Sequence, residues 1–161
     1  MVLLLLSLVS PAAAETVKGK ATAKEGDLVS VSGQDIRLFG IDAPDKEQRC
    51  KNVRGVEYDC FELARTALER LIGGQPVDCT LKPSPPAQKL GVCTAGGRDL
   101  AALMVLTGYA LAYRPVADDY TAEEVRAMSY RRGLWAGRVE PPWLWRSRQL
   151  ADKAAGRQKT P

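Results

Sequence analysis

The chain has 161 residues, which suits one ordinary domain and is short for two. Hydrophobic residues make up 45% and charged residues 26%, a balance typical of a globular protein. Lys and Arg outnumber Asp and Glu by 23 to 19, and this charge of +4 permits an anionic partner without requiring one. The sequence has no histidine, which excludes histidine zinc ligands, Ser-His-Asp triads and imidazole bases. Catalysis would have to depend on carboxylates, Arg, Lys, Tyr or a metal bound through oxygen.

The first 14 residues, MVLLLLSLVSPAAA, combine a short apolar run with a small-residue cleavage site. They predict a secretory signal peptide over residues 1–14, although no Lys or Arg precedes the apolar run. The run is too short to span a bilayer, so no membrane association is expected after cleavage. The mature protein is expected to be exported, to the periplasm or the medium.

Strands are predicted between Val17 and Ile41, where apolar residues recur near period two and Ser32-Gly33-Gln34-Asp35 supplies a hairpin turn. A helix is predicted over residues 61–72, because Phe61, Ala64, Leu68 and Leu71 share one face and glycines follow.

Two further strands, Val77–Leu81 and Leu90–Thr94, flank a Pro-rich turn. A second helix is predicted from the N-cap Asp99 to Thr107. A third begins at Thr121, where a capping box with Glu124 is expected, and ends near Gly133. This order, with five or so short strands in one small domain, predicts an α+β fold, a closed or nearly closed β-barrel packed with about three α-helices, over residues 15–148. Residues 149–161 are expected to form a flexible tail.

Four cysteines occur, and none forms a C-x-x-C pair. Two disulfides are therefore expected in an exported protein, with three possible connectivities. We favour Cys50–Cys60 and Cys79–Cys93, since each pair closes a short local loop.

Two acidic residues and one arginine form the strongest candidate site. Asp27 and Asp42 lie at the ends of neighbouring β segments, where their converging carboxylates would attract a hard cation such as calcium. Arg37 lies near the same strand end and could bind a phosphate oxygen. From spacing alone, the aspartates are also explained as turn formers and the arginine as a solvated strand residue.

Several strings together resemble the staphylococcal nuclease (thermonuclease-like) family of OB-fold proteins. They are Gly26-Asp27, Arg37-Leu38-Phe39-Gly40-Ile41-Asp42-Ala43-Pro44, Gly97-Arg98-Asp99-Leu100, Gly108-Tyr109-Ala110, Arg132-Gly133-Leu134-Trp135 and Pro142-Trp143-Leu144-Trp145-Arg146. The resemblance implies calcium-dependent phosphodiester hydrolysis in DNA and RNA, with single-stranded nucleic acid as a partner. The protein is expected to be a monomer. The four cysteines also resemble those of exported members of the family.

The resemblance assigns roles to particular residues. Asp27, Asp42 and the main-chain carbonyl of Ala43 would bind calcium, and Arg37 would stabilise charge on the scissile phosphate. Tyr109 and Tyr113, which follow the second helix, would reach the nucleotide.

Two positions depart from the family pattern. Asp45 stands where the family has its catalytic glutamate, and Gln88 where it has a second arginine. The nearby cation Lys89 is a candidate nucleotide-binding residue, although strand alternation directs it to the opposite face unless the Pro-rich turn shifts the register. These departures predict weak or lost activity. The alternatives are a non-catalytic nucleic-acid- or anion-binding OB module and an exported protein-interaction domain. Trp143 and Trp145 are expected to fix the C-terminal segment to the barrel rather than to stack on bases.

Overall fold

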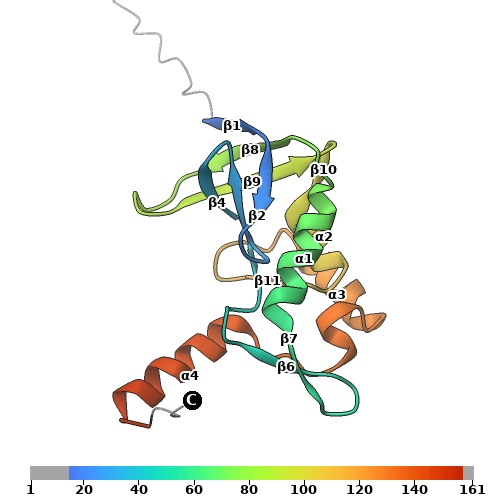
Figure 1. Cartoon of the computed structure of the whole chain (residues 1–161), viewed down its shortest axis with the longest axis vertical. Coiled ribbons are helices and arrows are strands. Elements are labelled where there is room, and N and C mark those ends of the chain that lie inside the picture. The colour runs from blue at the N-terminus through green and yellow to red at the C-terminus, as the bar shows by residue number, and fades with distance from the viewer. Residues whose placement is uncertain (1–14, 158–161) are drawn as a thin grey trace, which may run out of the picture.

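The computed structural model describes residues 15–157, so the predicted signal peptide lies outside the described residues. A seven-stranded sheet forms one part of the molecule and helices cover it (Figure 1). Its strands are β1 (Thr16–Gly19), β2 (Ala21–Ala23), β3 (Leu28–Val31), β4 (Gln34–Leu38), β8 (Val77–Lys82), β9 (Lys89–Ala95) and β10 (Arg98–Asp99). Two small sheets pair β5 (Ile41–Asp42) with β11 (Leu111–Ala112), and β6 (Arg49–Lys51) with β7 (Glu57–Asp59). The helices are α1 (Cys60–Ile72), α2 (Leu100–Leu106), α3 (Thr121–Ser129), the 3-10 helix η1 (Gly133–Ala136) and α4 (Pro142–Ala154).

The strand order is β1-β8-β9-β4-β3-β2, with β10 paired to β9. The β4–β9 pairing is parallel and the other pairings are antiparallel. This arrangement confirms the predicted α+β, OB-like fold. The sheet is not closed into a barrel by a ladder between β1 and β2, and it has more strands than the five expected. The first strand is interrupted at Lys20, so one chain segment supplies both ends of the strand order.

The β3–β4 hairpin turns at Ser32 and Gly33, as predicted. Both residues have positive φ, 49° and 80°, which is the geometry of the tight turns that match strand twist. The Ser32 hydroxyl donates to the Lys18 carbonyl at 3.1 Å, which connects the turn to β1. Arg37 and Leu38 therefore lie at the far end of this hairpin, close to the residues that precede β3.

Helix α1 packs beside α2 against the sheet (Figure 1). Asp59 caps its first turn by accepting from the Glu62 N–H, and Gly73 ends it with φ 57°. Ala64 and Leu68 are fully buried in the main core. Apolar residues of the sheet and of α2 complete this core, among them Val29, Ile36, Leu38, Leu100 and Met104.

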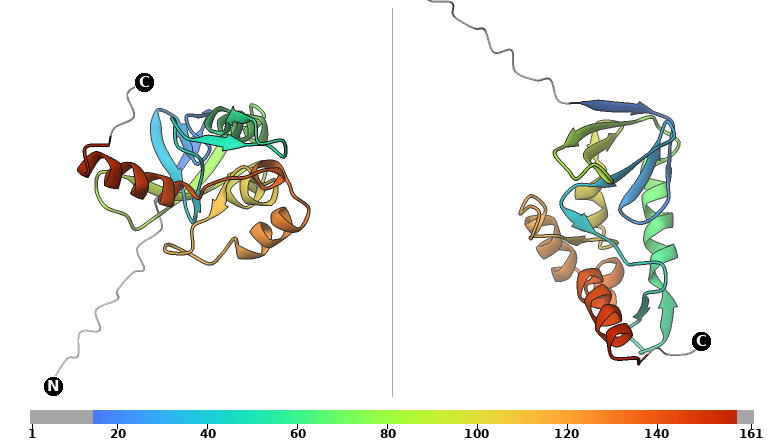
Figure 2. Two further views of the ribbon diagram at one scale, coloured as in Figure 1. Left: turned by 90° about the horizontal axis from the view of Figure 1, so that it is seen from below. Right: turned by 90° about the vertical axis from the view of Figure 1, so that its left-hand side faces the viewer.

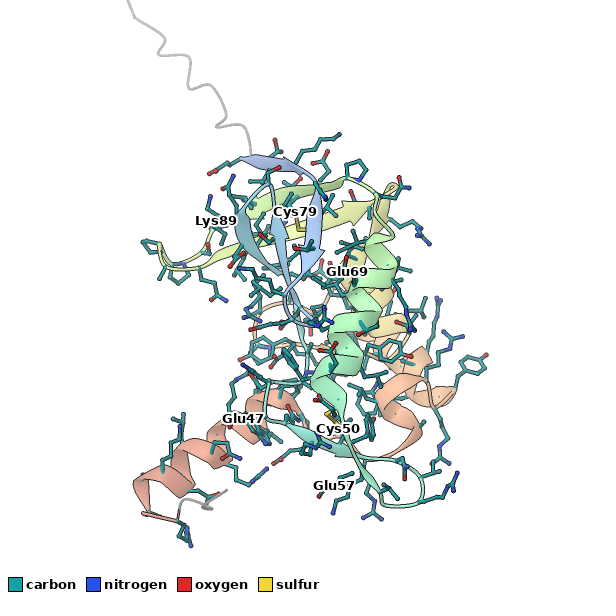
Figure 3. The ribbon with its side chains drawn as sticks, in the orientation of Figure 1. Glu47, Cys50, Glu57, Glu69, Cys79 and Lys89 are labelled. Carbon is teal, nitrogen blue, oxygen red and sulfur yellow. A yellow bond between two sulfur atoms is a disulfide. The ribbon has the colours of Figure 1, made fainter. Side chains whose placement is uncertain are left out.

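Two disulfide bonds are present, with the pairing that the sequence favoured. Cys50–Cys60 joins β6 to the first residue of α1, and Cys79–Cys93 joins directly opposed residues of β8 and β9. Figure 3 shows the two bridges at different ends of the molecule, through the labelled Cys50 and Cys79. The first bridge lies in a small second core with Leu111 and Leu134.

The expected capping box of α3 is wrong. The helix begins after Tyr120 with no side-chain cap, and the buried Thr121 hydroxyl has no hydrogen-bond partner within residues 15–157. Glu124 is buried instead, and its carboxylate accepts from the Ala112 N–H at 3.0 Å and from Arg114 at 3.3 Å. A tertiary contact with β11 therefore replaces the local one.

Helix α4 was not expected from the sequence as a fourth helix, and it continues past residue 148 to Ala154. It lies at the opposite end of the molecule from β1 and projects from the body (Figures 1 and 2). Its first turn is attached by a ring contact between Trp143 and Tyr113, whose centroids are 5.4 Å apart. Among the described residues, no helix is both long and apolar enough to cross a bilayer.

Candidate active site

One pocket of about 370 Å³ collects most of the candidate residues. It lies where the ends of β3, β4 and β9 meet the loop around β5 and the helix α4. Its polar lining comes from residues far apart in the sequence: Asp27, Arg37, Asp42, Asp45, Gln88, Tyr113 and Arg146. Six of these seven are residues that the sequence singled out, and Arg146 is the addition.

Arg37 is held by two carboxylates. It projects from β4 opposite Leu28, the first residue of β3, which places it next to the preceding residue Asp27. Its Nη1 donates to Asp27 Oδ1 at 2.5 Å and its Nη2 to Glu25 Oε2 at 2.9 Å. Paired carboxylates fix the plane of a guanidinium, so Arg37 is oriented before any ligand arrives.

Asp27 is almost fully buried, with 2% of its surface exposed. Burial raises its pKa to about 6, because the lowering effect of Arg37 is outweighed and the neighbouring Asp42 carboxylate adds repulsion. The Ala43 N–H also donates to Asp27 Oδ2 at 3.3 Å. Asp27 and the loop after β5 are therefore in direct contact, through the amide of Ala43.

Asp42 and Asp45 are both paired with Arg146 of α4. Arg146 Nη2 donates to Asp42 Oδ2 at 2.6 Å, and its Nη1 donates to Asp42 Oδ1 at 3.2 Å and to Asp45 Oδ2 at 2.8 Å. The Asp42 side chain is 8% exposed, and burial raises its pKa although Arg146 counteracts the shift. The two carboxylates raise the pKa of Arg146 in turn.

Gln88 and Tyr113 line the pocket, whereas Lys89 and Tyr109 do not. Gln88 is exposed and directly precedes β9. Lys89 donates to Gln34 Oε1, and Figure 3 shows it at the outer side of the sheet, as strand alternation suggested. Tyr109 borders a separate pocket of about 180 Å³ that α1 also lines.

The pocket suits a calcium ion by residue type, because Asp27 and Asp42 offer carboxylate oxygens and repel one another. Within residues 15–157 there is no group of three or more His, Cys, Asp or Glu side chains that could hold a metal. An ion would therefore need backbone carbonyls and water besides these two carboxylates. Both oxygens of Asp42 are hydrogen-bonded to Arg146, so the ion would have to displace that guanidinium.

The sequence did not predict that Arg146 lines the pocket, although this residue ends the Pro142–Arg146 string. Its partners lie 101 and 104 residues earlier in the chain, and no local pattern connects them. The available signal was an arginine inside an aromatic segment expected to pack against the barrel.

Comparisons with known proteins agree with the geometry. The family model described as staphylococcal nuclease homologue matches residues 35–137, more than half of the chain. This match includes Arg37, Asp42, Asp45 and Gln88. The succinoglycan biosynthesis protein ExoI of Rhizobium meliloti (strain 1021) is 27% identical over 133 residues, which cover 80% of this chain and 69% of ExoI. The chain therefore belongs to the staphylococcal nuclease homologue family and carries a thermonuclease-like domain, of the kind that cleaves or binds nucleic acid.

Proposed function

We propose that this protein is a calcium-dependent nuclease of reduced activity, which hydrolyses phosphodiester bonds of single-stranded DNA or RNA. The observation that carries the proposal is the pocket itself, in which Arg37, Asp27, Asp42 and Asp45 converge. Family membership supplies the reaction class, and the pocket supplies residues of the required chemistry.

Arg37 binds the scissile phosphate in this proposal. Its contacts with Asp27 and Glu25 use one N–H of each Nη atom, and a guanidinium has five N–H donors. Three donors are therefore available to phosphate oxygens, and their orientation is fixed in advance. Charge that develops on those oxygens is stabilised most by donors that need no reorganisation.

Asp45 is the candidate base that accepts a proton from the attacking water. Calcium bound by Asp27 and Asp42 would polarise the phosphate and orient that water. Asp45 Oδ2 already accepts from Arg146, so the carboxylate is fixed in position at the pocket wall. Its side chain is one methylene shorter than the glutamate of the family pattern, and a displacement of roughly 1 Å can lower a rate about 100-fold.

Gln88 is the second reason for reduced activity. It donates a hydrogen bond but carries no charge, so it cannot neutralise a phosphate dianion or a departing alkoxide. Compared with the family pattern, the pocket keeps the phosphate-binding Arg37 but has an uncharged residue, Gln88, in place of the second arginine.

A calcium-dependent cleavage assay tests the proposal. Single-stranded DNA and RNA are incubated with the protein in calcium or in chelator, and Arg37→Gln is compared with Arg148→Gln, a matched control outside the pocket. We expect calcium-dependent cleavage that Arg37→Gln reduces by at least about 100-fold and Arg148→Gln leaves unchanged. Cleavage by Arg37→Gln at the original rate would refute the assignment.

A second function is favoured by two observations. Gln88 is uncharged, and Asp42 and Asp45 are both neutralised by Arg146, an arrangement that suits a non-catalytic module binding nucleic acid or another anion. The same assay separates the two, because such a module binds the oligonucleotide in calcium and leaves it intact.

The two disulfides favour an oxidising compartment. With the predicted signal peptide, they support export to the periplasm or the medium, and we propose that the exported protein is a monomer. Fractionation of cells that express the full chain, followed by sedimentation of the exported protein, tests both points.

A further inference from the structure

We propose that Arg146 of α4 is a second phosphate-binding residue of the pocket and supplies the positive charge that Gln88 lacks. This inference rests on the proposed function, because it concerns how the same pocket binds a phosphodiester. Arg37 and Arg146 are the basic residues among the pocket's described lining. A phosphate that enters therefore meets positive charge from β4 on one side and from α4 on the other.

The two arginines are held in the same way. Arg37 bridges Asp27 and Glu25, and Arg146 bridges Asp42 and Asp45. The two oxygens of Asp42 accept from Nη1 and Nη2 of Arg146, one each. Asp45 Oδ2 accepts from the other N–H of Nη1. The Nε–H and one Nη2–H remain, and no acceptor for them occurs in the described part of the chain. These two N–H groups lie on one edge of the guanidinium and match two oxygens of a phosphate.

The attachment of α4 fixes where Arg146 lies. Gln48 is fully buried and connects two segments: its Oε1 accepts from the Asp45 N–H at 3.2 Å, and its Nε2 donates to the Glu140 carbonyl at 2.6 Å. The Trp143–Tyr113 contact adds a second attachment. Arg146 is thus positioned against the loop of Asp45 by the buried Gln48 and by a ring contact, unlike an arginine on a free helix surface.

The exposure of Arg146 and the acidic lining of the pocket both favour a phosphate-binding role for this arginine. The Arg146 side chain is 42% exposed, so a ligand in the pocket reaches it without unfolding α4. The pocket lining holds the carboxylates of Asp27, Asp42 and Asp45, which repel a phosphodiester. Without Arg146, Arg37 alone would oppose that repulsion.

Oligonucleotide binding without cleavage tests the inference. A fluorescently labelled single-stranded oligothymidylate is titrated in chelator, where the proposed calcium-dependent cleavage does not occur, and its anisotropy is followed. Arg146→Gln should weaken binding at least tenfold. The salt dependence of oligonucleotide binding should also fall in Arg146→Gln, by the equivalent of about one phosphate contact. Arg148→Gln is the matched control, since Arg148 lies on the same helix, is exposed and pairs with Glu140. It should change affinity less than about twofold.

Further variants separate the possible outcomes. Arg146→Lys keeps the charge and should recover part of the affinity, and Trp fluorescence of Arg146→Gln should show that α4 stays attached when affinity is lost. Loss of binding in Arg37→Gln with full binding in Arg146→Gln would overturn this inference and leave the proposed function intact. Absence of binding by the unmodified protein in chelator would overturn this inference, and absence of calcium-dependent cleavage in the separate assay would overturn the proposed function. Loss in Arg146→Gln with no recovery in Arg146→Lys, and with Trp fluorescence showing α4 detached, would assign Arg146 a structural role instead.

Discussion

Replacing Arg146 by glutamine should raise the affinity of the pocket for calcium. In the protein as it stands, both oxygens of Asp42 and one of Asp45 are hydrogen-bonded to the Arg146 guanidinium. A calcium ion that binds Asp42 must break these contacts and then lie close to a positive charge. Glutamine removes the charge and is too short to reproduce the contacts of the two Nη atoms, so both obstacles become smaller.

The size of the effect follows from the burial of the two partners. Removing one partner of a fully buried ion pair costs about 3–5 kcal/mol, whereas an exposed pair contributes about 0–1 kcal/mol. Here the Asp42 side chain is 8% exposed and the Arg146 side chain 42% exposed, so the contribution lies between these limits, at about 2 kcal/mol. At 1.4 kcal/mol for each tenfold change, Arg146→Gln should bind calcium about 30-fold more tightly.

Isothermal titration calorimetry at neutral pH measures this affinity directly. The unmodified protein should bind calcium weakly, and Arg148→Gln should match it, because Arg148 is on the same helix and does not line the pocket. Asp42→Ala should abolish the heat of binding. Equal or weaker calcium binding by Arg146→Gln would show that the guanidinium does not compete with the ion. Unchanged binding by Asp42→Ala would remove that carboxylate from the site.

Three further predictions concern catalysis and stability. The double variant Gln88→Arg, Asp45→Glu should increase calcium-dependent cleavage of single-stranded DNA about tenfold or more, and no gain would contradict the role given to position 88. Leu68→Ala should lower the free energy of unfolding by about 3 kcal/mol in urea, since Leu68 is fully buried; a loss below about 1 kcal/mol would contradict tight packing there. Burial raises the pKa of Tyr120 above its ordinary value of 10.0, and the neighbouring Asp99 carboxylate raises it further. As the pH rises, the Tyr120 hydroxyl therefore loses its proton at a lower pH in the unfolded chain than in the folded protein. The unfolding free energy should therefore fall as the pH rises past 10.0, and fall less in Tyr120→Phe, as denaturation at two pH values would show; equal slopes would contradict the shift.

The sequence predicted correctly those helices, strands and turns that are determined by residues close together in the chain. The helix after Asp59, the hairpin at Ser32-Gly33 and the strands on either side of the Pro-rich turn all lie close to their predicted places. Each depends on a cap, a turn or an apolar periodicity that short windows contain. The string from Arg37 to Pro44 carried most of the candidate site, because it ends β4 and forms β5 in one stretch.

The misses depend on contacts between distant segments. Glu124 reads as a capping residue, yet its burial against β11 gives it a different partner. Tyr109 and Tyr113 are equivalent candidates in sequence, and only the path of the chain after α2 shows that Tyr113 lines the pocket and Tyr109 does not. The place of Arg146 is determined by Gln48 and by ring packing, and neither contact has a signature within a window of ten or twenty residues.

Helix α4 follows the OB-like sheet and helices α1 to α3 in sequence and supplies the arginine that pairs with Asp42 and Asp45. The pocket therefore takes its acidic residues and their counter-charge from two segments that a single connection joins. A protease that cuts in the segment between η1 and α4 would separate Arg146 from the rest of the chain and leave the sheet core untouched. The clipped protein would expose Asp42 and Asp45 together, and the net charge at the mouth of the pocket would become more negative.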